Sequence, residues 1–256
     1  MNITELDENI TDSKTFSICT LVTDLSEYHQ MCESFRNAGF SNENSDFIYI
    51  NNTNGNKYDA YEGIRKFLNF SKNKYIIICH QDILLKFDNY DTLLKRIEEV
   101  NNLDKNWAIL GNAGHCSFND FRLRITDPYG ENRYQGPLPA QVYDLDENFI
   151  LIKNSAQLSL SNNISGFHFY ATDLCIIADI LGFSTYVIDF HLYHKSGGSC
   201  NPSFFQAKKK LIQKYTYAFR PRYMKTTCTK FFISGHSILN KLMMNKYMYS
   251  IRKRLK

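Results

Sequence analysis

Short hydrophobic runs alternate with amphipathic segments along the first 114 residues of the chain. The runs are rich in Ile, Val, Phe and Tyr and predict buried strands, whereas the segments between them repeat apolar residues at helical spacing. Strands that alternate with helices predict an α/β fold, in which helices flank a mostly parallel central sheet. The expected strands span residues 15–22, 45–50, 74–79 and 107–114, and the expected helices lie near 27–38, 58–70 and 90–100.

Two of these strands end in polar residues. The strand over 74–79 runs directly into His80-Gln81-Asp82, and the strand over 45–50 is followed by Asn51 and Asn52. A polar cap where a core strand meets solvent would explain such residues. Ligands of α/β sheets, however, bind beyond the carboxyl ends of the strands. Both interpretations stay open at this point, a surface cap or a ligand site.

The alternation breaks after residue 115. The stretch "DPYGENRYQGPLPA" is rich in Pro and Gly, so residues 116–141 predict a long surface loop of the kind that often forms a lid. Beyond it we expect a strand at 148–154, a helix at 171–182 and a strand at 185–190 that leads into "HLYHKSGGS". The expected organisation is a polar leader at 1–14, a domain at 15–206 with halves 15–114 and 115–206, and an extension at 207–256.

The composition of the chain indicates a folded protein and the cellular compartment in which it occurs. The chain of 256 residues is 43% hydrophobic, which is enough for a substantial core. Its seven cysteines are scattered without a C-x-x-C pair, a usage that indicates a reducing environment. The first residues lack the basic and apolar regions of a signal peptide, and no run reaches the roughly 18 apolar residues of a membrane span. We therefore expect a cytoplasmic protein.

Charge is distributed very unevenly. Residues 1–189 contain all 26 acidic residues and 15 of the 30 basic ones, whereas residues 190–256 contain 15 basic residues and no acidic one. A tail of this kind predicts an anionic partner. Apolar residues are interleaved with Lys and Arg at 231–251, so the basic extension could form an amphipathic helix on an anionic membrane surface. A helix packed on the domain is the alternative, and nucleic acid is a less favoured partner because no RNA- or DNA-binding motif accompanies the charge.

Three clusters of chemically active residues stand at the ends of the expected elements. They are His80-Gln81-Asp82, the acidic group of Asp144, Asp146, Glu147 and Asp173, and His191 and His194 with the Ser196–Ser199 turn. A carboxylate with an imidazole can hold a divalent ion, and a Gly-Gly turn lets backbone N–H groups approach a phosphate. A separate carboxylate could deprotonate a hydroxyl. Each cluster also has an ordinary structural explanation, such as a helix N-terminal acid or a buried histidine.

These residues resemble a known family. The segments "KYIIICHQDILL", "WAILGNAG", "DLDENF", "GFHFYATDLC" and "VIDFHLYHKSGGS" are similar to family-2-like glycosyltransferases of the GT-A fold, in the bacterial branch with His-Gln-Asp in place of Asp-x-Asp. The resemblance covers roughly residues 15 to 230. It implies a Rossmann-like GT-A sheet, a nucleotide-diphosphate-sugar donor, and Mn²⁺ or Mg²⁺ on the donor's phosphates.

The resemblance also implies roles for individual residues. Asp82 matches the last acid of Asp-x-Asp and is expected to bind the metal, with His194 and His191 as further ligands. His80 replaces the first acid, and an imidazole suits Mn²⁺ better than Mg²⁺. The donor is expected to contact the remaining matched residues, which are Asn51, Asn52, Tyr58, Asp59, His80, Gln81, Lys195, Ser196 and Ser199.

The resemblance leaves more than one candidate for the catalytic base. Ala171 occupies the position where the family usually has its acidic base. Asp173 is our first choice for the role, and Asp146, Glu147 and His168 are the alternatives. The implied reaction is an inverting transfer to a hydroxyl of a cell-surface glycan or glycolipid, such as lipopolysaccharide, at the inner face of the membrane. A non-catalytic protein that binds nucleotide sugars is the main alternative.

Overall fold

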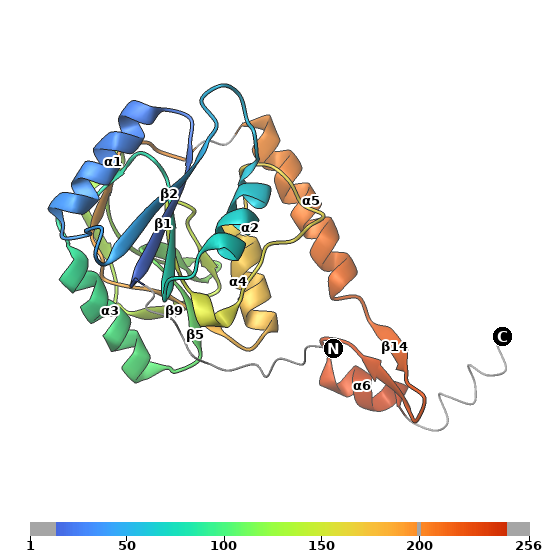
Figure 1. Ribbon diagram of the computed structural model, residues 1–256. Coiled ribbons are helices and arrows are strands. Elements are labelled where there is room, and N and C mark those ends of the chain that lie inside the picture. Colours follow the sequence, from blue (N-terminus) through green and yellow to red (C-terminus); the bar gives the residue numbers. More distant parts are fainter. Residues whose placement is uncertain (1–13, 199–200, 245–256) are drawn as a thin grey trace, which may run out of the picture. The chain divides into compact units, whose positions relative to one another are not determined.

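The computed structural model describes residues 14–198 and 201–244, and the chain divides into two compact units between Ala207 and Lys208. A seven-stranded sheet forms the centre of the first unit, in the order β2-β1-β3-β11-β5-β12-β9 (Figure 1). Pairing is parallel for β2-β1-β3 and β5-β12, whereas β11 and β9 run opposite to their neighbours. Its strands are β1 (Phe16–Val22), β2 (Ser45–Asn51), β3 (Tyr75–Cys79), β5 (Trp107–Gly111), β9 (Ala140–Val142), β11 (Phe149–Lys153) and β12 (Ser184–Val187).

Helices cover both faces of this sheet, which confirms the predicted α/β class. Figure 1 shows α1 and α3 on one side, and α2 and α4 on the other. Polar side chains begin three of the helices in the way that free N-terminal N–H groups require: Asp24 caps α1, Asp59 caps α2 and Asn89 caps α3. The helices are α1 (Leu25–Asn37), α2 (Ala60–Phe70), α3 (Tyr90–Leu103) and α4 (Tyr170–Ile180).

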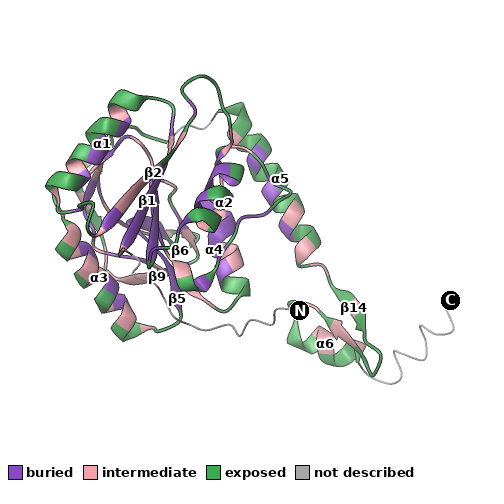
Figure 2. Ribbon diagram, in the orientation of Figure 1, coloured by how far each residue is buried: buried purple, intermediate pink, exposed green. Residues whose placement is uncertain are grey.

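The core between the sheet and α1 and α3 is rich in aromatic residues, and Figure 2 shows the strands of the sheet as mostly buried. Phe16, at the start of β1, lies 5.6 Å from the rings of both Phe40 and Tyr90, and Phe35 of α1 lies 5.2 Å from Phe40. Such large buried rings contribute much of the hydrophobic stabilisation of a domain. This core fixes the sheet rigidly, so the residues at its strand ends have defined positions.

The prediction of a surface loop at 116–141 is wrong, because most of this segment forms β-strands. A second sheet has the order β10-β6-β7-β13-β4, with β8 paired to β7. Leu123 and Ile125 of β7 point into the core while Arg122 and Arg124 alternate with them, and this short period was obscured by the Pro and Gly that follow. The strands are β4 (Ile83–Leu84), β6 (Ala113–Ser117), β7 (Asp120–Asp127), β8 (Gly130–Gln135), β10 (Asp144–Leu145) and β13 (Leu192–His194).

The single strand expected at 107–114 is divided between the two sheets. It leaves the central sheet after Gly111 and joins the second sheet at Ala113. Buried Asn112 makes the transition, since its side chain donates a hydrogen bond to Arg124 O at 3.3 Å and its carbonyl accepts one from Arg124 N at 2.8 Å. A polar residue inside an apolar run is the sequence sign of this change of sheet.

The second unit starts within α5 (Pro202–Ala218). It continues with an antiparallel hairpin of β14 (Arg222–Lys225) and β15 (Lys230–Ile233), followed by α6 (Ser237–Met243). The prediction of one helix from residue 231 is wrong at its start, because Phe231 and Phe232 are in the hairpin and the helix begins at Ser237; residues 245–251 of that prediction lie outside the described part of the chain. Among the described residues, no helix is both long and apolar enough to cross a membrane.

Candidate functional site

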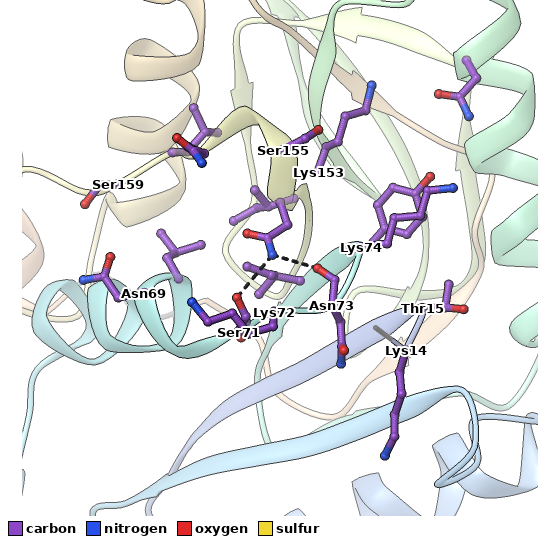
Figure 3. Close-up of a pocket in the computed structure, with 18 residues that line it drawn as sticks. Lys14, Thr15, Asn69, Ser71, Lys72, Asn73, Lys74, Lys153, Ser155 and Ser159 are labelled. Atoms are coloured by element: carbon purple, nitrogen blue, oxygen red, sulfur yellow. Dashed lines mark hydrogen bonds between the residues drawn. The ribbon is translucent and has the colours of Figure 1, made fainter. Parts of the chain in front are cut away.

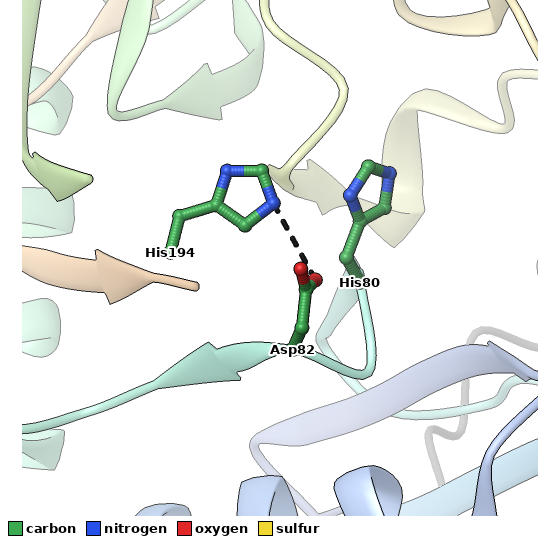
Figure 4. Close-up of side chains that lie close together, drawn as sticks. All are labelled: His80, Asp82 and His194. Atoms are coloured by element: carbon green, nitrogen blue, oxygen red, sulfur yellow. Dashed lines mark ion pairs between the residues drawn. The ribbon is translucent and has the colours of Figure 1, made fainter. Parts of the chain in front are cut away.

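Three of the predicted residues meet at one end of the central sheet (Figure 4). His80 follows β3, Asp82 precedes β4, and His194 ends β13, which pairs with β4. One ligand atom from each residue lies within 4.8 Å of the others, and His194 Nε2 is 3.4 Å from Asp82 Oδ1. The strand that ends in His-Gln-Asp thus brings His80 and Asp82 next to His194, which lies 112 residues after Asp82 in the sequence. This meeting of distant residues favours a ligand site over a surface cap.

The electrostatics of this group suit a metal ion. Burial alone would raise the pKa of Asp82, but hydrogen bonds with His194 and Ser196 and the nearby imidazoles lower it below its usual value. Burial, together with the neighbouring His194, lowers the pKa of His80. At neutral pH the site therefore presents an ionised carboxylate and a neutral imidazole at His80, which are the forms that coordinate a cation.

Tyr170 at the start of α4 orients His80, a role that was not predicted from the sequence. Its hydroxyl donates to Glu147 O at 3.0 Å and lies 2.9 Å from His80 Nε2. Because the hydroxyl proton is used by Glu147, Nε2 of His80 donates to the tyrosine oxygen and Nδ1 is left with its lone pair. This is the outer-shell arrangement that commonly fixes the tautomer of a metal-binding histidine.

Gln81, a predicted donor contact, is hydrogen-bonded within the fold. Its Oε1 accepts hydrogen bonds from Thr23 N at 2.8 Å and Asp24 N at 3.0 Å, and its Nε2 donates to Glu27 at 3.1 Å. These contacts hold the turn between β1 and α1 beside the His80 group. Lys195 reaches the same helix, where its ammonium group donates to Gln30 at 2.7 Å.

Two of the residues predicted to contact the donor also have structural roles. Buried Asn52 accepts from Lys57 N at 3.0 Å and donates to Tyr58 O at 2.9 Å, which shapes the loop after β2. Asp59 caps α2 and accepts from Gly166 N at 2.8 Å. Asn51 lies at the edge of this loop and hydrogen-bonds to Thr53.

The tyrosine of this loop, Tyr58, contacts a lysine side chain of α2. The ammonium group of Lys66 lies 4.5 Å from the centre of the Tyr58 ring, a cation–π distance. An open hollow, whose lining includes Asn51 and Lys57, borders the loop. The structure therefore leaves Asn51 at the surface of this hollow while Asn52 and Asp59 are engaged within the fold.

The acidic candidates separate into two groups. Glu147 accepts a hydrogen bond from Tyr170 N at 2.7 Å, and burial, together with the charge of Asp146, raises the pKa of its carboxyl to about 8. Asp146 is exposed, and its charge acts on His80. Both are therefore near the three-residue group. Asp144 is close by on β10, and burial raises its pKa.

Asp173 and His168 have other surroundings. Asp173 is fully buried, and its two carboxylate oxygens accept from Ser161 N at 2.8 Å and Ser161 Oγ at 2.7 Å. His168 packs edge-on against Phe204 and lies 3.3 Å from Ser203 Oγ. The structure thus gives Asp173 the setting of a residue that holds the chain segment before α4, which differs from the setting expected of a base.

His191 does not join the ligand group, contrary to the prediction. Its ring stacks on Phe87 at 3.8 Å, and its Nε2 lies 2.9 Å from Thr126 Oγ1. His191 comes directly before β13 (Leu192–His194), in which Leu192 and His194 are buried. Ser196 Oγ does lie 3.2 Å from His194 Nε2, whereas Ser199 is outside the described residues.

Solved structures define the class of fold. Over 74% of this chain, TarS 1–349 of S. aureus in complex with UDP-GlcNAc superposes with a TM-score of 0.50 at 9% identity, and GalNAc-T7 with UDP, GalNAc and Mn²⁺ does so with a TM-score of 0.50 at 8% identity. Both are glycosyltransferases, and this chain spans 60% and 45% of their lengths. The fold is therefore of the GT-A type, as predicted.

One curated relative defines the family. The protein described as "ATP synthase subunits region ORF 6" of Fuscovulum blasticum is 32% identical over 226 residues, which cover 86% of this chain and 91% of the relative. The chain belongs to the family of that protein. The description of the relative states no activity, and no family profile matches the chain.

Proposed function

We propose that this protein is a glycosyltransferase that uses a nucleotide-diphosphate-sugar donor bound beside His80, Asp82 and His194. The observation that carries the proposal is the meeting of these three side chains at the carboxyl end of β3, in a GT-A fold. Open α/β sheets bind their ligands in this place. The fold neighbours with TM-scores of 0.50 are described in complexes with UDP-GlcNAc and with UDP, GalNAc and Mn²⁺.

The donor atoms fit a transition-metal ion better than Mg²⁺. Mg²⁺ prefers an octahedral shell of oxygen ligands, whereas two imidazoles with one carboxylate suit Mn²⁺ and other first-row ions. When bound, such a cation would neutralise charge that develops on the departing diphosphate. Asp82 supplies the negative charge of the site, His80 and His194 supply nitrogen ligands, and Tyr170 keeps the His80 ring in place.

Lys195 and the turn after His194 are proposed to bind the phosphates. Lys195 N donates to Asp82 O at 3.2 Å, so the turn is attached directly to the ligand group. Tyr129 lies close over Gly197: a Cβ atom at residue 197 would be 2.8 Å from the tyrosine hydroxyl. A glycine here lets the β7–β8 hairpin approach the turn, and Ser196 and the backbone N–H groups of the turn can face an anion.

Glu147 is our proposed catalytic base. Its carboxylate accepts from the N–H groups of Tyr170 and Ala171, so it lies at the position that Ala171 leaves without an acid. The base removes a proton from an acceptor hydroxyl, whose oxygen then bonds to the anomeric carbon as the bond to the diphosphate breaks. A pKa of about 8 is well matched to a hydroxyl near neutral pH. Asp146 is exposed next to it and is the alternative.

The proposed acceptor is a hydroxyl of a glycan or a lipid-linked sugar, as in polysaccharide or lipopolysaccharide assembly. In the second unit, Ile238 and Leu242 are 73% and 56% exposed one turn apart on α6, with Lys241 beside them. An apolar ridge with basic neighbours favours an anionic lipid surface over nucleic acid. This unit is therefore proposed to bring the enzyme to the cytoplasmic face of a membrane.

Donor turnover is the test of the proposal. The full chain is incubated with UDP-, GDP-, CMP- and dTDP-sugars, with Mn²⁺ or EDTA, and the release of nucleotide is measured with and without lipid-linked acceptors. We expect release with one nucleotide class that requires the cation and disappears in Asp82→Asn. Tight donor binding without release under any acceptor condition would instead support a non-catalytic protein that binds nucleotide sugars.

A further inference from the structure

A large basic cavity lies at the opposite edge of the central sheet from the His80 group. It has a volume of about 1040 Å³ and is formed where β1 and β3 begin and β11 ends (Figure 3). Four lysines line it, namely Lys14, Lys72, Lys74 and Lys153, and none of the described residues in the lining is acidic. β3 has five residues, so at about 3.3 Å per residue this cavity is roughly 16 Å from the His80 end.

A pair of stacked aromatic rings contacts two of these lysines. The rings of Tyr75 and Trp107 are stacked with centroids 6.1 Å apart and an angle of 16° between their planes. The ammonium group of Lys74 lies 5.3 Å from the centre of the Tyr75 ring, and that of Lys153 lies 4.1 Å from the centre of the Trp107 ring. The rings attract both cations and keep them at the cavity in spite of their mutual repulsion.

An acidic group near Lys153 compensates only part of the repulsion between its ammonium group and the neighbouring lysines. Burial, and then the charges of Lys105 and Lys74, lower the pKa of Lys153, and the nearby Asp104 opposes the shift. Lys14 differs, because it forms an ion pair with Asp46 at 2.6 Å. An anion in the cavity would compensate the charges of Lys74 and Lys153, which no carboxylate in the lining does.

The polar frame of the cavity is fixed by hydrogen bonds. Asn154 donates to Asn73 O at 2.8 Å and to Ser71 O at 3.2 Å, and Asn73 donates to Phe16 O at 2.9 Å. Around this frame Ser155 and Ser159 are exposed at the rim. A lining with fixed geometry binds a ligand without the entropy cost of ordering it first.

We propose that this cavity binds a small anion that carries two or more phosphate groups, at a site separate from the donor site. Lys74 and Lys153 bind the charged oxygens, Lys72 adds charge at the rim, and the rim serines donate hydrogen bonds. The volume is at the upper end of ordinary ligand pockets and accommodates an anion the size of a nucleotide. The site does not depend on the glycosyltransferase proposal, since it shares no residue with it.

Inorganic pyrophosphate and tripolyphosphate are the probes, used in calorimetric titrations of the full chain at low salt with EDTA present. Four proteins are compared: wild type, the double variant Lys74→Gln/Lys153→Gln, the charge-matched control Lys66→Gln/Lys95→Gln, and Asp82→Asn. We expect saturable binding to wild type, to the control and to Asp82→Asn. Binding to the cavity variant should be at least about tenfold weaker, and added salt should weaken binding to wild type.

Three results would overturn the proposal: no saturable binding to wild type, equal affinity in the cavity variant, or loss of binding in Asp82→Asn alone, which would place the anion in the donor site. Circular dichroism establishes that the double variant is folded. If it is not, Lys72→Gln replaces it, because this side chain is exposed at the rim. A several-fold loss of affinity is then expected, and an unchanged affinity contradicts the site.

Discussion

Replacing Asp82 with Asn should remove most of the affinity for a divalent cation while leaving the fold intact. The change is nearly isosteric, and it removes the only carboxylate of the ligand group. Loss of an outer-shell partner of a metal site typically costs 10- to 100-fold in affinity. Loss of a ligand that supplies the negative charge should therefore cost about 100-fold or more.

Thermal unfolding in Mn²⁺ converts that loss into a measurable shift. At about 100 times its dissociation constant, the cation stabilises the wild-type protein by about 2.7 kcal/mol, and for a unit of this size that raises Tm by roughly 5–10 °C. If the dissociation constant rises 100-fold, the same concentration gives about 0.4 kcal/mol and a shift of about 1 °C.

The control is Asp179→Asn, an exposed acid on α4 outside the ligand group. It should keep the full shift. An Asp82→Asn protein that keeps the wild-type shift, or a wild-type protein without one at millimolar Mn²⁺, would refute the assignment of the metal site.

Three further predictions concern the base, the buried acid and the second unit. Glu147→Gln should lower kcat by about 10²–10⁴-fold and remove a rise of kcat/KM toward pH 8, whereas Asp146→Asn should keep that rise; an unchanged pH profile in Glu147→Gln would exclude it as the base. Because its folded-state pKa is raised, ionisation of Glu147 destabilises the fold as pH increases above about 4.5, so Glu147→Gln should be more stable than wild type at pH 8, by an amount on the order of 4 kcal/mol. Asp173→Asn should lower the free energy of unfolding by about 1–3 kcal/mol through its contacts with Ser161, with Asp179→Asn as control, and a stable variant without activity would restore Asp173 as a base candidate. Leu242→Glu should lower the fraction of protein that sediments with anionic vesicles, while donor turnover in solution stays unchanged. A fraction equal to that of wild type would contradict the proposal that the second unit binds a lipid surface.

The strand pattern predicted that His80 and Asp82 lie at a ligand-binding edge of the sheet, and the resemblance to glycosyltransferases added His194. Hydrophobic strands are visible in the pattern, and in an α/β sheet their polar ends must lie at the same edge. The buried run of β3 ends at Cys79 and the polar residues start at His80, as expected. The central sheet and its helices were predictable for the same reason.

Roles that depend on long-range hydrogen bonds were not predictable. Gln81 binds the turn at Thr23, and Asp59 binds Gly166, in each case a backbone group many residues away. Asp173 was the first choice for the base, because nothing in the sequence marks Ser161 as its partner. The second sheet was missed because the Pro and Gly residues after β7 obscured its alternation, and because the exposed positions of β7 and β8 are polar.

The measurement that tests the central claim most directly is anomalous X-ray diffraction from crystals grown with Mn²⁺ and the nucleotide that the turnover screen selects. We expect one anomalous peak in coordination distance of His80, Asp82 and His194, next to density for a diphosphate at Lys195. A nucleotide bound elsewhere, or a peak that lies away from these three side chains while the crystallised protein still turns over its donor, would contradict the account.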